Sequence, residues 1–208
     1  MGLRSRFFAF TYDRFSKGSE EAGLAEMRKN LIASASGDVL EIGGGTGANL
    51  GYYGTGVESL TITEPEAPML KRLERKAREQ NSQATVLRAP AEDLPFEDAS
   101  FDTVVSTLVL CGVDDQPRAV RELRRVLRPG GRLVFIEHVR SDNPRLAKMQ
   151  DRMNPVNRFL VCCDCNRSTL ETIRLAGFEV TELEQTELPK APPFVRPLIV
   201  GTATAPVA

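Results

Sequence analysis

The sequence predicts an α/β protein of one domain, residues 1–208, built on a doubly wound, seven-stranded and mostly parallel sheet. Seven short apolar runs alternate with helical segments along the chain. The first run, residues 39–42, stops at a glycine segment with Gly43, Gly45 and Gly47, and residues 48–50 then predict the opening of a helix. A strand, a glycine turn and a helix start place free N–H groups at the carboxyl edge of a sheet, where small ligands bind.

The other elements follow from apolar spacing and turn residues. Residues 19–32 predict a helix that Ser19 caps. Residues 57–63 predict the second strand, and residues 65–80 predict a charged helix with one apolar side. Further along, we expect strands at 84–87, 100–106 and 133–139, helices at 116–128 and 168–176, a strand that begins at 178, and a closing strand at 196–204. Residues 140–166 predict a long irregular segment, which inside a compact domain is usually functional.

Composition argues against several classes of function. The 27 Lys and Arg residues and the 28 Asp and Glu residues leave a net charge of −1, which gives no electrostatic basis for binding nucleic acid. No apolar run approaches the roughly 20 residues that span a bilayer, and the apolar stretch 7–10 is too short for a signal peptide. We therefore expect the four cysteines to be reduced thiols in a cytoplasmic protein.

Two acidic residues lie at the ends of predicted strands. Glu41 lies within the end of the first strand, and Glu64 follows the second strand about 20 residues after the glycines. The two oxygens of a carboxylate at this place can accept hydrogen bonds from both hydroxyls of a ribose. The glycine spacing differs from the dinucleotide fingerprint G-x-G-x-x-G, in which the third glycine comes one residue later. A tight turn without a ligand and a solvated loop glutamate are the competing interpretations.

The pattern Glu41-x-Gly43-x-Gly45-x-Gly47, with Glu64 after the next strand, resembles the motifs of class I S-adenosylmethionine-dependent methyltransferases, which have a Rossmann-like fold. The resemblance implies that S-adenosyl-L-methionine is the cofactor. Residues 88–96 resemble the segment that flanks the adenine in this family, although Pro90 stands where an aspartate is usual. The resemblance assigns these residues to the cofactor site: Glu41, Gly43, Gly45, Gly47, Glu64, Pro65, Ala91, Glu92, Thr107, Leu108 and Tyr12.

The downstream half of the chain narrows the resemblance to one group within this family. Residues 125–131, Glu137-His138-Val139, Cys165-Asn166 and Arg196-Pro197 resemble type-11 small-molecule methyltransferases related to the alkyl thiol methyltransferases, the methyltransferase-like seven group. This resemblance implies a small thiol as acceptor and an acceptor pocket formed by residues 140–166. It also makes His138, the only histidine, a candidate catalytic base. A packing or hydrogen-bonded histidine at a strand end is the competing interpretation of His138.

The sequence leaves the identity of the acceptor open. A phospholipid headgroup amine, a quinone or another hydroxylated metabolite can take the place of the thiol, and a cofactor-binding protein without turnover would carry the same motifs. Residues 1–36 are expected to form a lid, which contains Tyr12, and a helix, with at most peripheral membrane contact. The cysteines Cys162, Cys163 and Cys165 lack the paired spacing of zinc ligands, so we expect no metal site. The sequence sets no oligomeric state.

Overall fold

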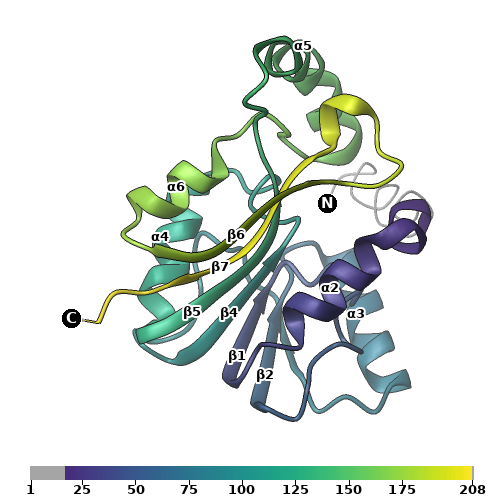
Figure 1. The fold of residues 1–208 in the computed structure, drawn as a ribbon. Helices are drawn as coiled ribbons and strands as arrows, with labels where there is room; N and C mark the ends of the chain where they lie inside the picture. Colours follow the sequence, from purple (N-terminus) through teal and green to yellow (C-terminus); the bar gives the residue numbers. More distant parts are fainter. Residues whose placement is uncertain (1–16, 208) are drawn as a thin grey trace.

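The computed structural model describes residues 17–207, which form a seven-stranded sheet with helices on both faces (Figure 1). The strand order is β3-β2-β1-β4-β5-β7-β6. Strands β1 to β5 pair in parallel, and β7 runs antiparallel between β5 and β6. The strand order reverses between β1 and β4, and sheets of this kind bind ligands in the crevice at such a point. The predicted fold class is therefore confirmed.

All seven predicted strands are present. They are β1 (Gly37–Ile42), β2 (Val57–Thr63), β3 (Thr85–Leu87), β4 (Phe101–Thr107), β5 (Leu127–His138), β6 (Glu179–Glu187) and β7 (Pro197–Thr204). Strand β5 begins earlier than predicted, because Leu127 already pairs with Phe101 of β4. The register then shifts across the turn residues before Arg132 pairs with Thr103.

The helices cover the sheet in two layers (Figure 1). Helices α2 (Ala25–Ile32) and α3 (Ala67–Glu79) lie on one face, and α4 (Gln116–Val126) and α6 (Thr169–Leu175) lie on the other. The largest core cluster fills the space between the sheet and α4 with α6, and it includes Leu40, Val104, Leu123, Phe135 and Ile173. Helix α5 (Pro144–Val161) stands beyond the carboxyl ends of the strands and packs against the short turn η2 (Pro193–Val195). No helix within residues 17–207 is long and apolar enough to cross a bilayer.

The first predicted helix is present, but Ser19 does not cap it. Ser19 has helical dihedral angles, and its hydroxyl donates to the carbonyl of Pro189 at 2.7 Å. A π-helical turn, η1 (Glu20–Leu24), precedes α2, and Gly23 interrupts the helix with φ +136°. The prediction failed because the Ser19 hydroxyl binds a segment that is distant in sequence.

The helix expected after the glycine segment is absent from the described chain. Residues 45–52 form a series of turns between β1 and β2. Glycine is a poor helix former, and this connection contains Gly47, Gly51, Gly54 and Gly56. The glycine segment therefore has no helix N-terminus behind it, and other groups must hold its shape.

The irregular segment predicted at 140–166 is also wrong, because most of it is helix α5. Asn143 caps the helix by accepting from the backbone N–H of Arg145 at 2.9 Å and of Leu146 at 3.4 Å. Pro144 occupies the first turn, where its missing N–H costs nothing. Pro155 lies inside the helix, and two prolines in one segment made the sequence look irregular.

Gly201 of β7 offers a direct test of the sheet. A Cβ atom there would lie 2.2 Å from the carbonyl oxygen of Glu182 in β6. We predict that Gly201→Ala lowers the free energy of unfolding by about 2 kcal/mol, which corresponds to a fall of roughly 4–8 °C in Tm. Gly51→Ala is the control, because a Cβ at Gly51 would meet no atom within 4 Å. Equal Tm values for the two variants in thermal unfolding would contradict the observed pairing of β6 with β7.

Candidate active site

The glycine segment that follows β1 forms an open turn where the strand order reverses. Gly43 and Gly45 both have left-handed backbone angles, with φ +56° and +55°. A Cβ at Gly43 would lie 2.7 Å from the side chain of Val109, so this position has no room for a larger residue. At Gly45 the nearest atom to a Cβ would be 4.0 Å away, so the backbone faces open space. A ligand can therefore approach the main chain closely at Gly45.

Glu64 lies directly after β2 and ties that strand end to the glycine segment. One carboxylate oxygen accepts from the backbone N–H of Gly45 at 2.9 Å, and the other accepts from the backbone N–H of Glu66 at 2.8 Å. Burial raises the pKa of Glu64, and these two N–H groups oppose the rise. Each carboxylate oxygen has two acceptor sites, so both can accept a further hydrogen bond from a ligand. Pro65, also assigned to the cofactor by sequence, follows it in an exposed position.

Beneath the glycine segment lies a buried polar network. The Glu41 carboxylate accepts from the side-chain amide of Asn49 at 2.8 Å and from the Tyr53 hydroxyl at 2.6 Å. The Thr107 hydroxyl oxygen accepts from Asn49 at 2.9 Å and from the Arg28 guanidinium at 2.8 Å. Burial raises the pKa of Glu41, while Tyr53, Asn49 and Arg28 oppose the rise. Glu41 and Thr107, which the sequence assigned to the cofactor, therefore form these hydrogen bonds within the protein.

Arg28 is the buried member of this network that the sequence analysis missed. It lies on α2 with only 2% of its surface exposed, and it also donates to Asn49 at 3.0 Å and to Glu20 at 3.1 Å. A signal was available, because Arg28 falls four residues after Leu24 and four before Ile32, on the apolar face of the helix. A lone arginine on such a face indicates a buried carboxylate or polar partner.

The loops that follow β3 and β4 contain the residues expected beside the adenine and the methyl group of the cofactor. Ala91 is buried, and Glu92 accepts from the backbone N–H of Asp114 at 2.7 Å, so it joins the loops after β3 and β4. Leu108, at the end of β4, has a positive φ of 60°, which is unusual for a leucine. Strained backbone of this kind concentrates at functional sites. Tyr12, the predicted covering residue, lies outside the described residues.

Glu137 and His138 end β5 and point to opposite faces of the sheet. One Glu137 oxygen accepts from the Ser106 hydroxyl at 2.6 Å and from the backbone N–H of Val109 at 3.1 Å. The other oxygen, Oε2, is buried and has no hydrogen-bond partner within residues 17–207. Burial raises the pKa of Glu137 to about 7, although these hydrogen bonds oppose the rise.

His138 is 5% exposed, and its Nδ1 has no hydrogen-bond partner in the described part of the chain. Burial lowers the pKa of His138 to about 4, while hydrogen bonds to the backbone of Pro197 and Val195 oppose the fall. The imidazole is therefore neutral at pH 7. A buried ring nitrogen without a hydrogen-bond partner is rare in folded proteins and calls for an explanation.

Comparisons with known proteins then identify the family. Residues 40–135 match the family described as a methyltransferase domain. The human thiol S-methyltransferase TMT1A is 34% identical over 187 residues, which cover 86% of this chain and 76% of the human protein. The human thiol S-methyltransferase TMT1B is 36% identical over 181 residues, which cover 83% and 73%. The chain belongs to the thiol S-methyltransferase family.

A solved structure agrees on the fold of this methyltransferase. A SAM-dependent methyltransferase from Thermotoga maritima superposes with a TM-score of 0.71 at 24% identity, covering 99% of this chain and 100% of that one. The predictions that the chain is a class I methyltransferase and that S-adenosylmethionine is its cofactor are confirmed. The open space at Gly45 and the remaining acceptor sites on Glu64 fit such a cofactor.

The cysteines of the methyltransferase form no metal centre in the described part of the chain. Cys111, Cys163 and Cys165 are buried together beside Val161 and Phe194, while Cys162 is exposed. Burial raises the pKa of Cys165 to about 12, with nearby Cys163 adding to the rise. Cys165 is therefore a neutral thiol at pH 7, which rules it out as a ready nucleophile.

A hollow of about 390 Å³ lies away from the glycine segment and Glu64. Its lining comes from α6, from the facing strands β6 and β7, and from the loop after β5, and it includes Arg140, Ser168, Arg174 and Gln185. None of the glycines, nor Glu64, borders it. The residues that the sequence assigns to the cofactor lie apart from this hollow, so the glycine segment is the candidate active site.

Arg28 is predicted to be essential for the network under the glycine segment. Arg28→Met leaves Glu41 without its buried cation and should lower the free energy of unfolding by about 3–5 kcal/mol. The matched control is Lys29→Met, because Lys29 is the exposed neighbour on the same helix. Chemical unfolding measures both variants. An Arg28→Met protein as stable as Lys29→Met would show that the buried network contributes nothing.

Glu137 is predicted to make stability depend on pH. The carboxyl titrates near 4.5 in the unfolded chain and near 7 in the folded one, so the folded state holds the proton longer. Wild-type stability from this group is present below about pH 4.5 and falls as the pH rises to about 7. Glu137→Gln removes this loss.

The measurement is the free energy of unfolding of both proteins at about pH 5 and about pH 8. Relative to wild type, Glu137→Gln should gain up to about 3 kcal/mol between the two conditions. His138 titrates in both proteins, so its contribution cancels in the difference. A difference that stays constant with pH would contradict a carboxyl that is protonated in the folded state.

Proposed function

We propose that this methyltransferase transfers the methyl group of S-adenosylmethionine to the thiol of a small organic molecule. The observation that carries the proposal is the identity of 34–36% to two thiol S-methyltransferases over more than four fifths of the chain. The chemistry of the site supports it, because a thiol ionises near pH 8.5 in water and needs little help from a base.

In this proposal the backbone of Gly43, Gly45 and Gly47 holds the methionine end of the cofactor, and Glu64 accepts from the ribose hydroxyls. Ala91 and Glu92 border the adenine, and Leu108 borders the reacting end. S-adenosylmethionine supplies an electrophilic methyl group on a sulfonium when it is bound. The chain contributes mainly by positioning the acceptor and excluding water.

His138 is proposed to contact the acceptor, with its free Nδ1 as a hydrogen-bond acceptor for the thiol S–H. With a pKa of about 4, the imidazole would hold a proton poorly at pH 7, so we assign it positioning of the acceptor in preference to full proton removal. Residues 1–36 are proposed as lid and helix, and residues 140–166 as the border of the acceptor. The four free thiols suit a reducing, cytoplasmic setting.

The first test is binding of S-adenosylmethionine and S-adenosylhomocysteine by calorimetric titration. Glu64→Gln removes one carboxylate acceptor from the ribose and should weaken binding by about 10- to 100-fold, the cost of one or two hydrogen bonds to a charged group. Glu66→Gln is the control, because Glu66 is exposed and only its backbone N–H contacts Glu64. Equal affinities of the two variants would remove Glu64 from the cofactor site.

The acceptor is tested separately, by methyl transfer to alkyl thiols in competition with phenols and primary amines. The proposal expects thiols to be methylated first. Cofactor binding with transfer only to phenols or amines would overturn the thiol assignment, while cofactor binding without transfer to any acceptor would indicate a binding protein.

A further inference from the structure

Helix α5 is attached to the body of the protein through polar groups. Its buried side chains are Ala147, Gln150 and Asn157. Gln150 donates to the carbonyls of Val139 at 3.0 Å and Cys165 at 2.7 Å, and Asn157 donates to the carbonyl of Cys163 at 2.6 Å. A helix on the surface of a soluble domain normally buries its apolar stripe and exposes its polar one. In α5 two amides lie on the buried side, and large apolar side chains are exposed.

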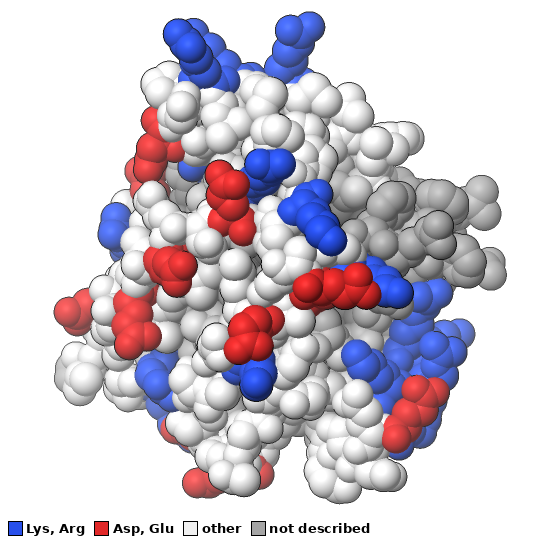
Figure 2. Space-filling view, turned by 45° about the vertical axis from the view of Figure 1, so that its right-hand side comes forward, with Lys and Arg blue, Asp and Glu red and all other residues white. Residues whose placement is uncertain are grey.

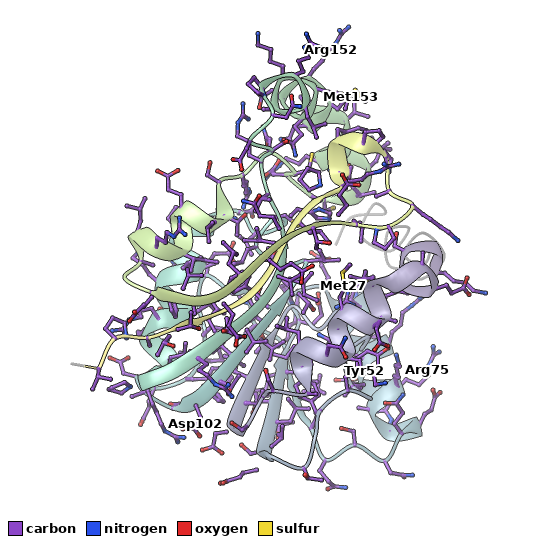
Figure 3. The ribbon with its side chains drawn as sticks, viewed as in Figure 1. Met27, Tyr52, Arg75, Asp102, Arg152 and Met153 are labelled. Atoms are coloured by element: carbon purple, nitrogen blue, oxygen red, sulfur yellow. The ribbon has the colours of Figure 1, made fainter. Side chains whose placement is uncertain are left out.

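Four apolar side chains of α5 form a row on its outer side. Met149, Met153, Val156 and Leu160 are spaced by four, three and four residues, so they form one row along the helix. Leu160 is 63% exposed and Val156 is 52% exposed. Figure 3 shows Met153 at the end of the molecule that α5 forms, remote from the sheet. Leaving such a row in water is unfavourable, because apolar surface gains free energy when it is removed from water.

A row of basic residues runs beside the apolar one. Arg145, Lys148 and Arg152 are spaced by three and four residues and are all exposed. No ion pair joins any of the three to an acidic residue in the part of the chain that the structure describes. Basic side chains project from the top of the molecule in Figure 2, where Figure 1 places α5. Since the whole chain has a net charge of −1, this positive surface is local to the helix.

We propose that α5 docks on the surface of an anionic phospholipid bilayer. A helix that lies in the membrane interface needs an apolar row for the acyl boundary and cations for the lipid phosphates, and α5 presents both. Lys and Arg can extend their charged ends to the headgroups while their stems stay apolar. Docking in this way brings the carboxyl edge of the sheet, above which α5 stands, to the membrane surface (Figure 1). The proposal needs neither the cofactor nor methyl transfer.

The test is co-sedimentation of the full chain with vesicles of phosphatidylcholine, with and without phosphatidylserine, and without cofactor. We expect binding that is stronger on the vesicles with phosphatidylserine. Leu160→Glu should lower the partition coefficient by about tenfold, because it places a carboxylate in the apolar row. Leu175→Glu is the matched control, since Leu175 is 81% exposed on α6 and changes the net charge equally. Circular dichroism and Tm confirm that both variants are folded.

A second variant tests the basic row. Arg145→Gln with Arg152→Gln should weaken binding to the phosphatidylserine vesicles by about fivefold for each removed charge, and should change binding to pure phosphatidylcholine little. Absence of vesicle binding by wild type, or equal binding by Leu160→Glu and wild type, overturns the proposal. So does a dimer in sedimentation velocity that Leu160→Glu dissociates while no vesicles are bound, because the face would then join two copies of the chain.

Discussion

The cofactor edge of this methyltransferase depends on how the Glu41 carboxylate is buried. A glycine segment without a following helix has high conformational entropy, so it keeps one shape only if other groups hold it. Asn49, from the turns that follow the glycines, is held between Glu41 of β1 and Thr107 of β4. Arg28 adds the positive charge that makes a buried carboxylate acceptable. Helix α2 is therefore part of the site as well as a cover for the sheet.

Three glutamates at strand ends share burial and a raised pKa, yet they serve different purposes. Glu41 has both oxygens bonded to side chains of the connection that follows the glycines, so it braces that connection. Glu64 has only backbone donors and retains acceptor sites that can face a ligand. Glu137 keeps one buried oxygen without a partner among the described residues, which favours its protonated form. The partners of each carboxylate, more than its position on the sheet, decide what it can do.

Helix α5 shows how attachment and exposure can be separated in one element. Buried amides of Gln150 and Asn157 satisfy backbone carbonyls on the body, and this leaves the apolar row free to face outward. Hydrogen bonds of this kind fix the orientation of a helix without consuming its apolar surface. An outward apolar row with adjacent cations is then available for a second phase such as a lipid surface.

The sequence by itself determined the seven strands, the glycine segment and the acidic residue after β2. Buried parallel strands are short apolar runs between turn residues, and such local patterns can be recognised without knowledge of the fold. Only the tertiary structure decided the role of Arg28, because its partner Thr107 is 79 residues away in the chain. It also decided that Ser19 bonds to Pro189, that turns replace a helix after Gly47, and that residues 144–161 are helical. For Arg28 and Ser19 the physical reason is the same. A buried hydrogen bond depends on which distant segments come together in the fold. Local secondary-structure propensity carries no information about those contacts.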